Sequence, residues 1–255
     1  MIMQKKHFIL DGVCYTSDLD WASESAISMM LEYFDEQDIH PTIFMTHPSR
    51  CVKEYACRGR VDLGIHPNFI LPSSQGNSIS EVIDYCLDLL PQAKVFRCHR
   101  WYASNDIYDL FYQKGLRYES NLCTLLEVVE PFRHRSGMIS FPTFFEDGAW
   151  IYHGYPMKFQ GNEFVFDQPG LKVINIHPMH FVLNTPYFRY MRDIKDRLPR
   201  ERWNSLTKQD MKALKNDHQP GIQDFLRDMV SHYRATGTKQ YTLQDAYKEW
   251  TFEEN

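Results

Sequence analysis

Short apolar runs alternate with amphipathic stretches along most of the chain. The runs have the length and composition of buried strands and lie at 13–16, 42–46, 61–65, 94–96, 116–118, 138–141 and 171–176. After the first run, apolar residues recur at the spacing of one helix face and predict a helix over 22–37. These residues are Ile27, Met30, Leu31 and Phe34. Strands that alternate with helices favour a largely parallel sheet, either open or closed into a barrel.

Capping and stop signals mark three further helices. A short helix is predicted over 49–57. Ser78 and Glu81 form a capping-box pattern that opens a helix ending at the next proline. Gly115 is the residue expected just after a helix over 105–114, because glycine readily takes the left-handed conformation there.

The second half of the chain is less regular. Residues 149–166 are interpreted as a loop or hairpin insertion. Residues 191–218 hold 13 charged side chains among 28 and few apolar anchors, which predicts a solvated helical excursion or lid rather than a binding patch. An amphipathic stripe then predicts a last helix, through Ile222, Phe225, Leu226, Met229, Val230 and Tyr233. A closing strand-to-helix turn is expected at 242–246.

The composition fits one α/β domain over residues 1–255. The net charge of −5 argues against nucleic acid as the main partner. No apolar run approaches 18 residues and 1–10 do not resemble a signal peptide, so we expect no membrane association and a cytoplasmic location. The six cysteines form no Cys-x-x-Cys pair, which indicates reduced thiols. The sequence leaves open whether the protein forms a homo-oligomer.

Polar residues with metal-binding or acid–base chemistry follow nearly every predicted strand. In chain order they are Asp18 and Asp20, His47, His66, Arg97 and His99, Ser120 and Asn121, Thr143, Glu146 and Asp147, then His177 and His180. Parallel α/β folds place their sites at these strand ends. Asp18 and Asp20 would project to the same face of an extended backbone, although an Asp-x-Asp can also be a helix N-terminus.

Several of these segments resemble the ordered motifs of the polysaccharide deacetylase (NodB-homology, carbohydrate esterase 4) superfamily. The segments are Thr16-Ser17-Asp18, Gly64-Ile65-His66-Pro67-Asn68, Phe96-Arg97-Cys98-His99, the run from Gly115 to Ser120, and Asn175-Ile176-His177-Pro178. They span about 13–184, and the Gly-Ile-His-Pro-Asn segment indicates a divergent branch. The resemblance implies a distorted, incomplete (β/α) barrel of about seven parallel strands. It also implies metal-dependent hydrolysis of an N-acetyl group on a sugar.

The resemblance assigns the metal ligands with one departure from the family pattern. Asp20 matches the metal-binding aspartate, displaced by one position, and His66 matches the first histidine of the His-x-x-x-His pair. Ile70 stands where the second histidine would fall. His99 is the best candidate for the missing imidazole, with His47 in reserve. Two imidazoles and a carboxylate suit Zn²⁺, and three protein ligands leave a fourth position for water.

The same resemblance assigns the catalytic groups. Asp18 matches the base, Arg97 the arginine that orients this base, and His177 the general acid. Asp147 or Glu146 could orient His177. We also expect Asp147, together with Trp101 and Tyr102, to contact the substrate. Trp101, Tyr102 and Trp150 could form a sugar platform, although core packing is the favoured explanation for each of these aromatics.

The leading hypothesis is a metal-dependent deacetylase acting on an acetamido sugar or polysaccharide precursor. One alternative is a barrel that has lost catalysis and serves in binding or assembly, which the absent second histidine would favour. Another is a hydrolase of a non-sugar amide, because the fold alone does not fix the function. A cysteine hydrolase using Cys98 and His99 is disfavoured, since neighbouring residues on a strand point to opposite faces.

Overall fold

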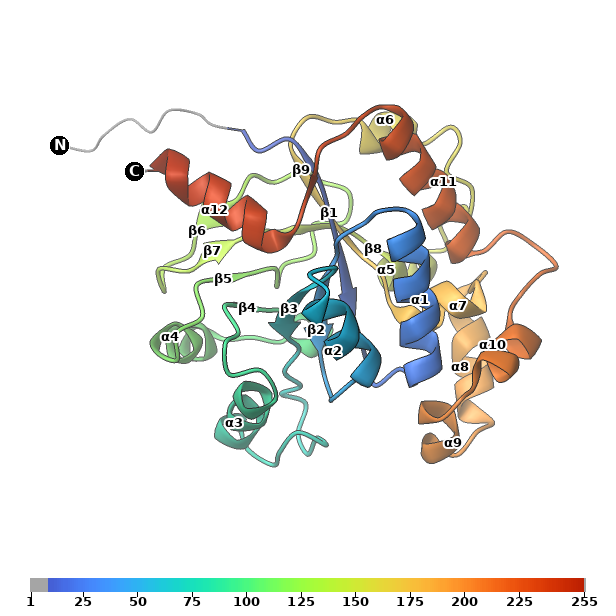
Figure 1. Ribbon diagram of the computed structural model, residues 1–255, viewed down its shortest axis with the longest axis horizontal. Coiled ribbons are helices and arrows are strands. Elements are labelled where there is room, and N and C mark those ends of the chain that lie inside the picture. Colours follow the sequence, from blue (N-terminus) through green and yellow to red (C-terminus); the bar gives the residue numbers. More distant parts are fainter. Residues whose placement is uncertain (1–8, 255) are drawn as a thin grey trace.

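The computed structural model describes residues 9–254, in which ten strands form one curled sheet, an incomplete barrel (Figure 1). The strands are β1 (Gly12–Asp18), β2 (Thr42–Met45), β3 (Asp62–Ile65), β4 (Val95–Phe96), β5 (Tyr118–Glu119), β6 (Phe132–Arg133), β7 (Ile139–Ser140), β8 (Thr143–Glu146), β9 (Leu171–Asn175) and β10 (Gln240–Tyr241). Their order is β6-β7-β5-β4-β3-β2-β1-β9-β8, with β10 paired to the start of β1. All pairs are parallel except β6 with β7, so the strand exits meet at one end of the barrel.

The alternation of side chains along β1 separates the interior of the barrel from the helix layer. Val13 and Tyr15 pack with the helices, and the Ser17 hydroxyl points to Met30 of the first helix. Cys14 belongs to the apolar interior. Two residues further on, Thr16 also faces inward, and Asp18 lies above it at the end of the strand. The interior face therefore changes from apolar to polar towards the carboxyl ends of the strands.

Helices cover the outside of the sheet and close one end of it. They are α1 (Glu24–Glu36), α2 (Arg50–Cys57), α3 (Ile79–Leu89), α4 (Asn105–Gln113), α5 (Asp147–Tyr152), α6 (Glu163–Phe166), α7 (Pro178–Leu183), α8 (Phe188–Asp196), α9 (Arg200–Asn204), α10 (Lys208–Leu214), α11 (Ile222–Ala235) and α12 (Leu243–Glu254). Helices α1, α7 and α11 share one apolar core, and α3 and α4 share another. In Figure 1, α12 lies towards the beginning of β1 and α8–α10 lie towards the other end of the strands. No helix in the range 9–254 is both long and apolar enough to cross a bilayer.

Most of the predicted elements are confirmed. The seven predicted strands all form, and Ser78 accepts a hydrogen bond from the amide of Glu81 at the start of α3. All six residues of the amphipathic stripe are buried in α11. The prediction for 149–166 was wrong, because this stretch contains most of α5 and all of α6. The side-chain carboxylate of Glu146 caps α5 by accepting from the amide of Ala149.

Candidate active site and metal centre

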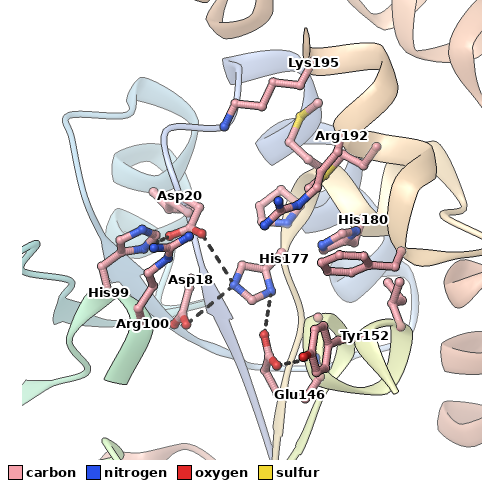
Figure 2. A pocket seen from close by; sticks show the side chains of 18 of the residues that line it. Asp18, Asp20, His99, Arg100, Glu146, Tyr152, His177, His180, Arg192 and Lys195 are labelled. Carbon is pink, nitrogen blue, oxygen red and sulfur yellow. Dashed lines mark hydrogen bonds and ion pairs between the residues drawn. The ribbon is translucent and has the colours of Figure 1, made fainter. Parts of the chain in front are cut away.

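A cavity of about 770 Å³ opens at the carboxyl ends of the strands (Figure 2). Its floor contains residues that follow β1, β3, β4, β8 and β9, and one wall comes from α8. Five strand exits and helix α8 therefore supply side chains to the same space. This is the end of a parallel α/β sheet at which ligand sites form.

Asp20, His66 and His99 form a group of three potential metal ligands on this floor. One ligand atom from each lies within 4.8 Å of the others. Asp20 Oδ1 is 2.9 Å from His99 Nδ1 and 3.2 Å from His66 Nε2. Both ring nitrogens of His66 are buried and make no hydrogen bond of acceptable geometry. Buried polar atoms are rarely left without a partner, so an unpaired imidazole in a group of nitrogen and oxygen donors fits a divalent cation.

The turn after β1, and not strand alternation, brings Asp20 into this group. The strand ends at Asp18, and Asp20 and Trp21 have φ angles of 44° and 55°. The amide of Trp21 donates to Thr46 Oγ1, which ties the turn to the loop after β2. The expectation of an extended backbone through Asp20 was therefore wrong. Burial would raise the pKa of Asp20, but its close contacts with His66 and His99 and the charge of His177 lower that pKa well below its usual value.

Backbone hydrogen bonds beyond the strand ends bring His66 and His99 together. The amide of His66 donates to Met45, and the amide of His99 donates to the carbonyl of Pro67. Gly64, two residues before His66, lies against the rings and methyls of β2 and β4. A Cβ there would come within 2.7 Å of Phe44, which explains a glycine in this motif.

Neither Ile70 nor His47 belongs to the three-ligand group. Ile70 is 41% exposed, lies outside the cavity lining, and donates its amide to the side chain of Asn68. The loop thus carries the position of the family's second histidine away from the floor. His47 Nδ1 is 2.7 Å from Thr46 Oγ1, and His47 likewise does not line the cavity.

Arg97 is fully buried beneath this floor and connects several strands. Its hydrogen-bond acceptors are Thr16 Oγ1 (2.9 Å), Asp18 Oδ1 (3.0 Å), Asn175 Oδ1 (2.7 Å), the Ser120 carbonyl (2.7 Å), Ser120 Oγ (2.8 Å) and Thr143 Oγ1 (2.9 Å). The guanidinium also lies 4.4 Å from the ring centre of Phe44. Arg97 is therefore fixed in position by partners on five strands or strand exits, and it holds Asp18 in place.

Asp18 is ionised and directed by this network. Its Oδ1 accepts from Arg97, and its Oδ2 accepts from Asn175 Nδ2 at 2.8 Å. Burial alone would raise the pKa of Asp18, but the positive charge of Arg97, with smaller contributions from His66 and His177, lowers that pKa below its usual value. Asp18 is thus a buried carboxylate that stays deprotonated near neutral pH.

His177 and Asp147 form a pair on the other side of β1. His177 Nδ1 is 2.5 Å from Asp147 Oδ1, and the amide of His177 donates to Asp147 Oδ2 at 2.7 Å. The other ring nitrogen, Nε2, faces the cavity, 3.9 Å from Asp18 and 3.7 Å from Asp20. Burial would lower the pKa of His177, but the carboxylate of Asp147 raises it well above its usual value. Glu146, which is 3.7 Å from His177 Nδ1, has a pKa raised to about 7 by burial.

Of the three residues predicted to contact the substrate, only one lines the cavity. Trp101 lines the cavity. Tyr102 is 50% exposed, contacts Phe69 and does not line the cavity. Asp147 is fully buried against His177. It therefore lies where it can orient the His177 ring, and it does not form part of the cavity wall. Trp150 is a core residue that packs on Phe225.

Cys98 does not have the environment of a nucleophile. Its thiol is 1% exposed, and burial raises its pKa well above the usual value. The neighbouring His99 directs Nδ1 to Asp20 and not to the sulfur. This arrangement argues against the cysteine-hydrolase alternative.

Two contributors to the site were not recognised from the sequence. Asn175 bridges Arg97 and Asp18, and its position two residues before His177 on a strand was the available signal. Helix α8 supplies a wall through Phe188, Met191, Arg192 and Lys195. Their i, i+3, i+4, i+7 spacing marks one helix face. The charged segment predicted from the composition begins only at residue 191, inside α8, so it left out Phe188 at the start of this face.

The fold and the arrangement of these residues define the class. An incomplete barrel carries a buried Asp–Arg pair, a His–Asp pair and a group of three potential metal ligands at its strand exits. These are features of the polysaccharide deacetylase (NodB-homology, carbohydrate esterase 4) superfamily of hydrolases. Within it, the chain belongs to the family of WbmS-like polysaccharide deacetylases, whose sequence profile matches residues 15–195.

One solved structure supports the fold assignment, and two more distant ones are reported for their similarity alone. WbmS from Bordetella bronchiseptica, described as a candidate polysaccharide deacetylase involved in O-antigen biosynthesis, is 24% identical with a TM-score of 0.76, covering 86% of this chain and 90% of that one. A candidate polysaccharide deacetylase from Mycobacterium smegmatis is 13% identical over 94% of this chain and 96% of its own, with a TM-score of 0.49. A family 4 carbohydrate esterase from Bacillus anthracis is 13% identical over 94% and 86%, with a TM-score of 0.45. A comparison with curated protein sequences gives no match.

Proposed function

We propose that this protein is a metal-dependent hydrolase that removes an N-acetyl or related amide-linked group from a sugar or polysaccharide precursor. The observation that carries the proposal is the convergence of Asp20, His66 and His99 within 4.8 Å, flanked by Asp18 and His177. Membership of the WbmS-like polysaccharide deacetylase family supports a sugar amide as the substrate. A role in building a surface polysaccharide, as described for WbmS, would fit such a reaction.

Asp20, His66 and His99 would hold the cation. Their two nitrogens and one oxygen favour Zn²⁺ among the common divalent ions, and the unpaired ring nitrogens of His66 fit this assignment. When bound, such an ion polarises an amide carbonyl and makes nearby water more acidic. Asp20 and the unpaired imidazole of His66 are the groups that an ion would satisfy.

Asp18 acts as the general base. It stays ionised because Arg97 and Asn175 donate to its two oxygens, so it can accept a proton from the water that attacks the acyl carbon. Arg97 does not itself line the cavity, and it acts by positioning Asp18 and by stabilising its charge. This division of labour explains why a buried arginine lies below the site.

His177 acts as the general acid through Nε2. Its Nδ1 faces Asp147, which fixes the ring and leaves the opposite nitrogen directed into the cavity. The raised pKa keeps His177 protonated near neutral pH, so that it can transfer a proton to the leaving amine nitrogen. Trp101, at the cavity wall, offers an aromatic surface to a sugar ring.

Metal analysis combined with an acetate-release assay tests the proposal. The native protein should bind one Zn²⁺ per chain and release acetate from N-acetylglucosamine derivatives. His66→Ala should lose both properties. His218→Ala changes an exposed histidine outside the cavity and is the matched control. A native protein without affinity for divalent metal, or acetate release that persists in His66→Ala, would overturn the proposal.

The two alternatives become outcomes of the same test. The alternative of an inactive binding barrel was based on the absence of the family's second histidine. His99 lies beside Asp20 and His66 and offers a third ligand in its place, which weakens this alternative. A protein that binds metal but hydrolyses only acylated amines without a sugar would instead be a non-sugar amidase.

A further inference from the structure

We propose that the substrate of this site carries an anionic group, a phosphoryl group or a carboxylate, which Arg192 and Lys195 of α8 bind together with Arg100. The inference rests on the proposed function and adds the chemical class of the substrate. It arises from three cationic side chains that line the same cavity as the metal-ligand group.

Helix α8 presents one face to the cavity. Phe188, Met191, Arg192 and Lys195 follow the spacing of a single helix stripe, and all four line the cavity. Figure 2 shows Arg192 and Lys195 above His177, on the side of the cavity away from Glu146. Arg100 comes from a different segment, directly after His99, and also reaches into the cavity (Figure 2). Two independent elements therefore bring positive charge to one space.

Within residues 9–252, these three cations have no protein counter-ion. Among residues 9–252, no carboxylate lies within ion-pair distance of Arg100, Arg192 or Lys195. Other cations of this region have such partners, as in the pairs Arg189–Asp193 at 2.8 Å, Arg202–Asp210 at 2.7 Å and Lys208–Glu32 at 2.5 Å. Arg192 lies 4.8 Å from the ring centre of Phe188, and Lys195 lies 5.7 Å from that of Trp203. Aromatic rings hold these two side chains at the wall and leave their charges free for a ligand.

With the exception of Asp196, the acidic residues of the cavity have other partners or lie away from Arg192 and Lys195. Asp18 is paired with Arg97, and Asp20 contacts the two metal-ligand histidines. Glu146 lies beside His177 at the opposite side of the cavity from α8. Asp196 lines the cavity next to Lys195 in the sequence but forms no ion pair with it within the described part of the chain. Two cations of α8 therefore face the cavity against one carboxylate, and the α8 side keeps a net positive charge.

The backbone at Arg100 supports a functional position for this side chain. Arg100 and Trp101 have φ angles of 55° and 59°, a left-handed conformation that non-glycine residues adopt at a cost. This conformation breaks the short helical turn after β4 and directs Arg100 to the cavity while Trp101 stays against Arg97. Strain of this kind is retained where the position of a side chain matters.

The size of the cavity limits what can carry the anion. A volume of about 770 Å³ falls within the range of small-molecule sites. A monosaccharide with a phosphate or a nucleotide attached, or a short acidic sugar, would fill it. Arginine suits both groups because its planar guanidinium binds phosphate and carboxylate through paired hydrogen bonds.

Substrate comparison tests the inference. The probes are N-acetylglucosamine, N-acetylglucosamine 1-phosphate, UDP-N-acetylglucosamine and an N-acetylhexosaminuronic acid, assayed with the native chain and with Arg192→Gln/Lys195→Gln. The double variant should lower kcat/KM for an anionic probe about 10- to 100-fold more than for the neutral sugar. Arg189→Gln, a change to an arginine of α8 that lies outside the cavity lining, should not alter this ratio. Equal losses on neutral and anionic probes would overturn the inference, and the probe most affected identifies phosphoryl or carboxylate as the anion.

A binding measurement separates this inference from the proposed function. N-Acetylglucosamine 1-phosphate is titrated calorimetrically into the native full-length chain, once in EDTA and once with Zn²⁺. The double variant should weaken binding about tenfold or more in both conditions, and Arg189→Gln should bind as the native chain does. Such binding without hydrolysis of any probe would overturn the proposed function alone. Hydrolysis without any preference for, or variant-sensitive binding of, anionic probes would overturn the inference alone.

Discussion

The carboxylate of Asp18 lies 3.0 Å from the guanidinium of Arg97, and the two side chains are 4% and 0% exposed. Removing one partner of such a buried pair leaves the other charge uncompensated, so the two residues act as a unit. The pair joins the end of β1 to the segment after β4 and places an ionised carboxylate at the floor of the cavity. The Asp20, His66 and His99 group lies next to it, and the two functions can be separated by substitution.

Asp18→Asn should keep the metal and lose catalysis. Asparagine can still accept a hydrogen bond from Arg97 but cannot accept the proton of the attacking water. We expect a loss of at least about 100-fold in kcat, the usual contribution of a general base. Metal content and kcat are measured on the same sample, with the melting temperature as a check on folding. Metal loss in this variant would contradict the assignment of Asp18 as the base.

Asp20→Ala should have the opposite pattern and lose the metal. Its carboxylate is the oxygen donor of the three-ligand group. Metal content after dialysis against buffered Zn²⁺ is the measurement. Asp217→Ala, a change at an exposed carboxylate, is the control. If Asp20→Ala kept its metal and Asp18→Asn lost it, the roles of the two aspartates would be exchanged.

His99→Ala should weaken metal binding by about 100-fold or more, since it removes one of three protein ligands. His47→Ala is a closely matched comparison, because His47 was the other candidate and instead lies against Thr46. Dissociation constants from competition with a chelator decide between them. The opposite ranking of the two variants would assign His47 as the third ligand.

Asp147→Asn should shift the alkaline limb of the pH–rate profile to lower pH. Burial lowers the pKa of His177, and the carboxylate of Asp147 raises it well above the usual value. The acid must be protonated, so activity falls as pH rises through this pKa. Without the carboxylate the pKa of His177 drops, and the limb in kcat/KM should move down by about 1–2 pH units. An unmoved limb would mean that another group donates the proton.

Glu119→Gln should make the protein more stable at alkaline pH. Glu119 is buried, which raises its pKa from 4.5 to about 7, and it accepts from the amide of Asn121. Because the folded state binds this proton more tightly than the unfolded state, the free energy of unfolding falls as pH rises from about 4.5 to about 7. The substitution removes this loss, worth up to about 3 kcal/mol at pH 8. Urea unfolding at pH 5 and pH 8 measures it, with exposed Glu36→Gln as the control, and an unchanged pH dependence would contradict the prediction.

Local sequence patterns predicted much of the sheet but not β8. The apolar run at 138–141 is followed at once by Thr143, which was read as a strand exit. The chain instead passes through only two residues from β7 to β8, which pairs with β9 at the other end of the strand order. Pairing partners far apart in sequence leave no local signal. The same limit applies to 149–166, where short helices are stabilised by core contacts of Trp150 and Phe166 and not by helix propensity.

The family motifs predicted which residues meet on the floor, because each follows a strand. The charged segment was harder to interpret. Its composition predicts helices, which α8, α9 and α10 form, but which face of α8 meets the cavity depends on how α8 packs against α5 and α7. The role of Asn175 was missed for a similar reason, since one amide that serves two charged partners is visible only in three dimensions.

The central position of β1 has a consequence for how such proteins can diversify. Asp20 follows β1, and His66 and His99 follow β3 and β4 on one side of β1. Asp147 and His177 follow β8 and β9 on the other side. A change in the loops after β3 or β4 can therefore alter this ligand group without moving His177. The two groups stay coupled by charge, because His177 Nε2 lies 3.7 Å from Asp20, so a different ion in the proposed site would also shift the pH dependence.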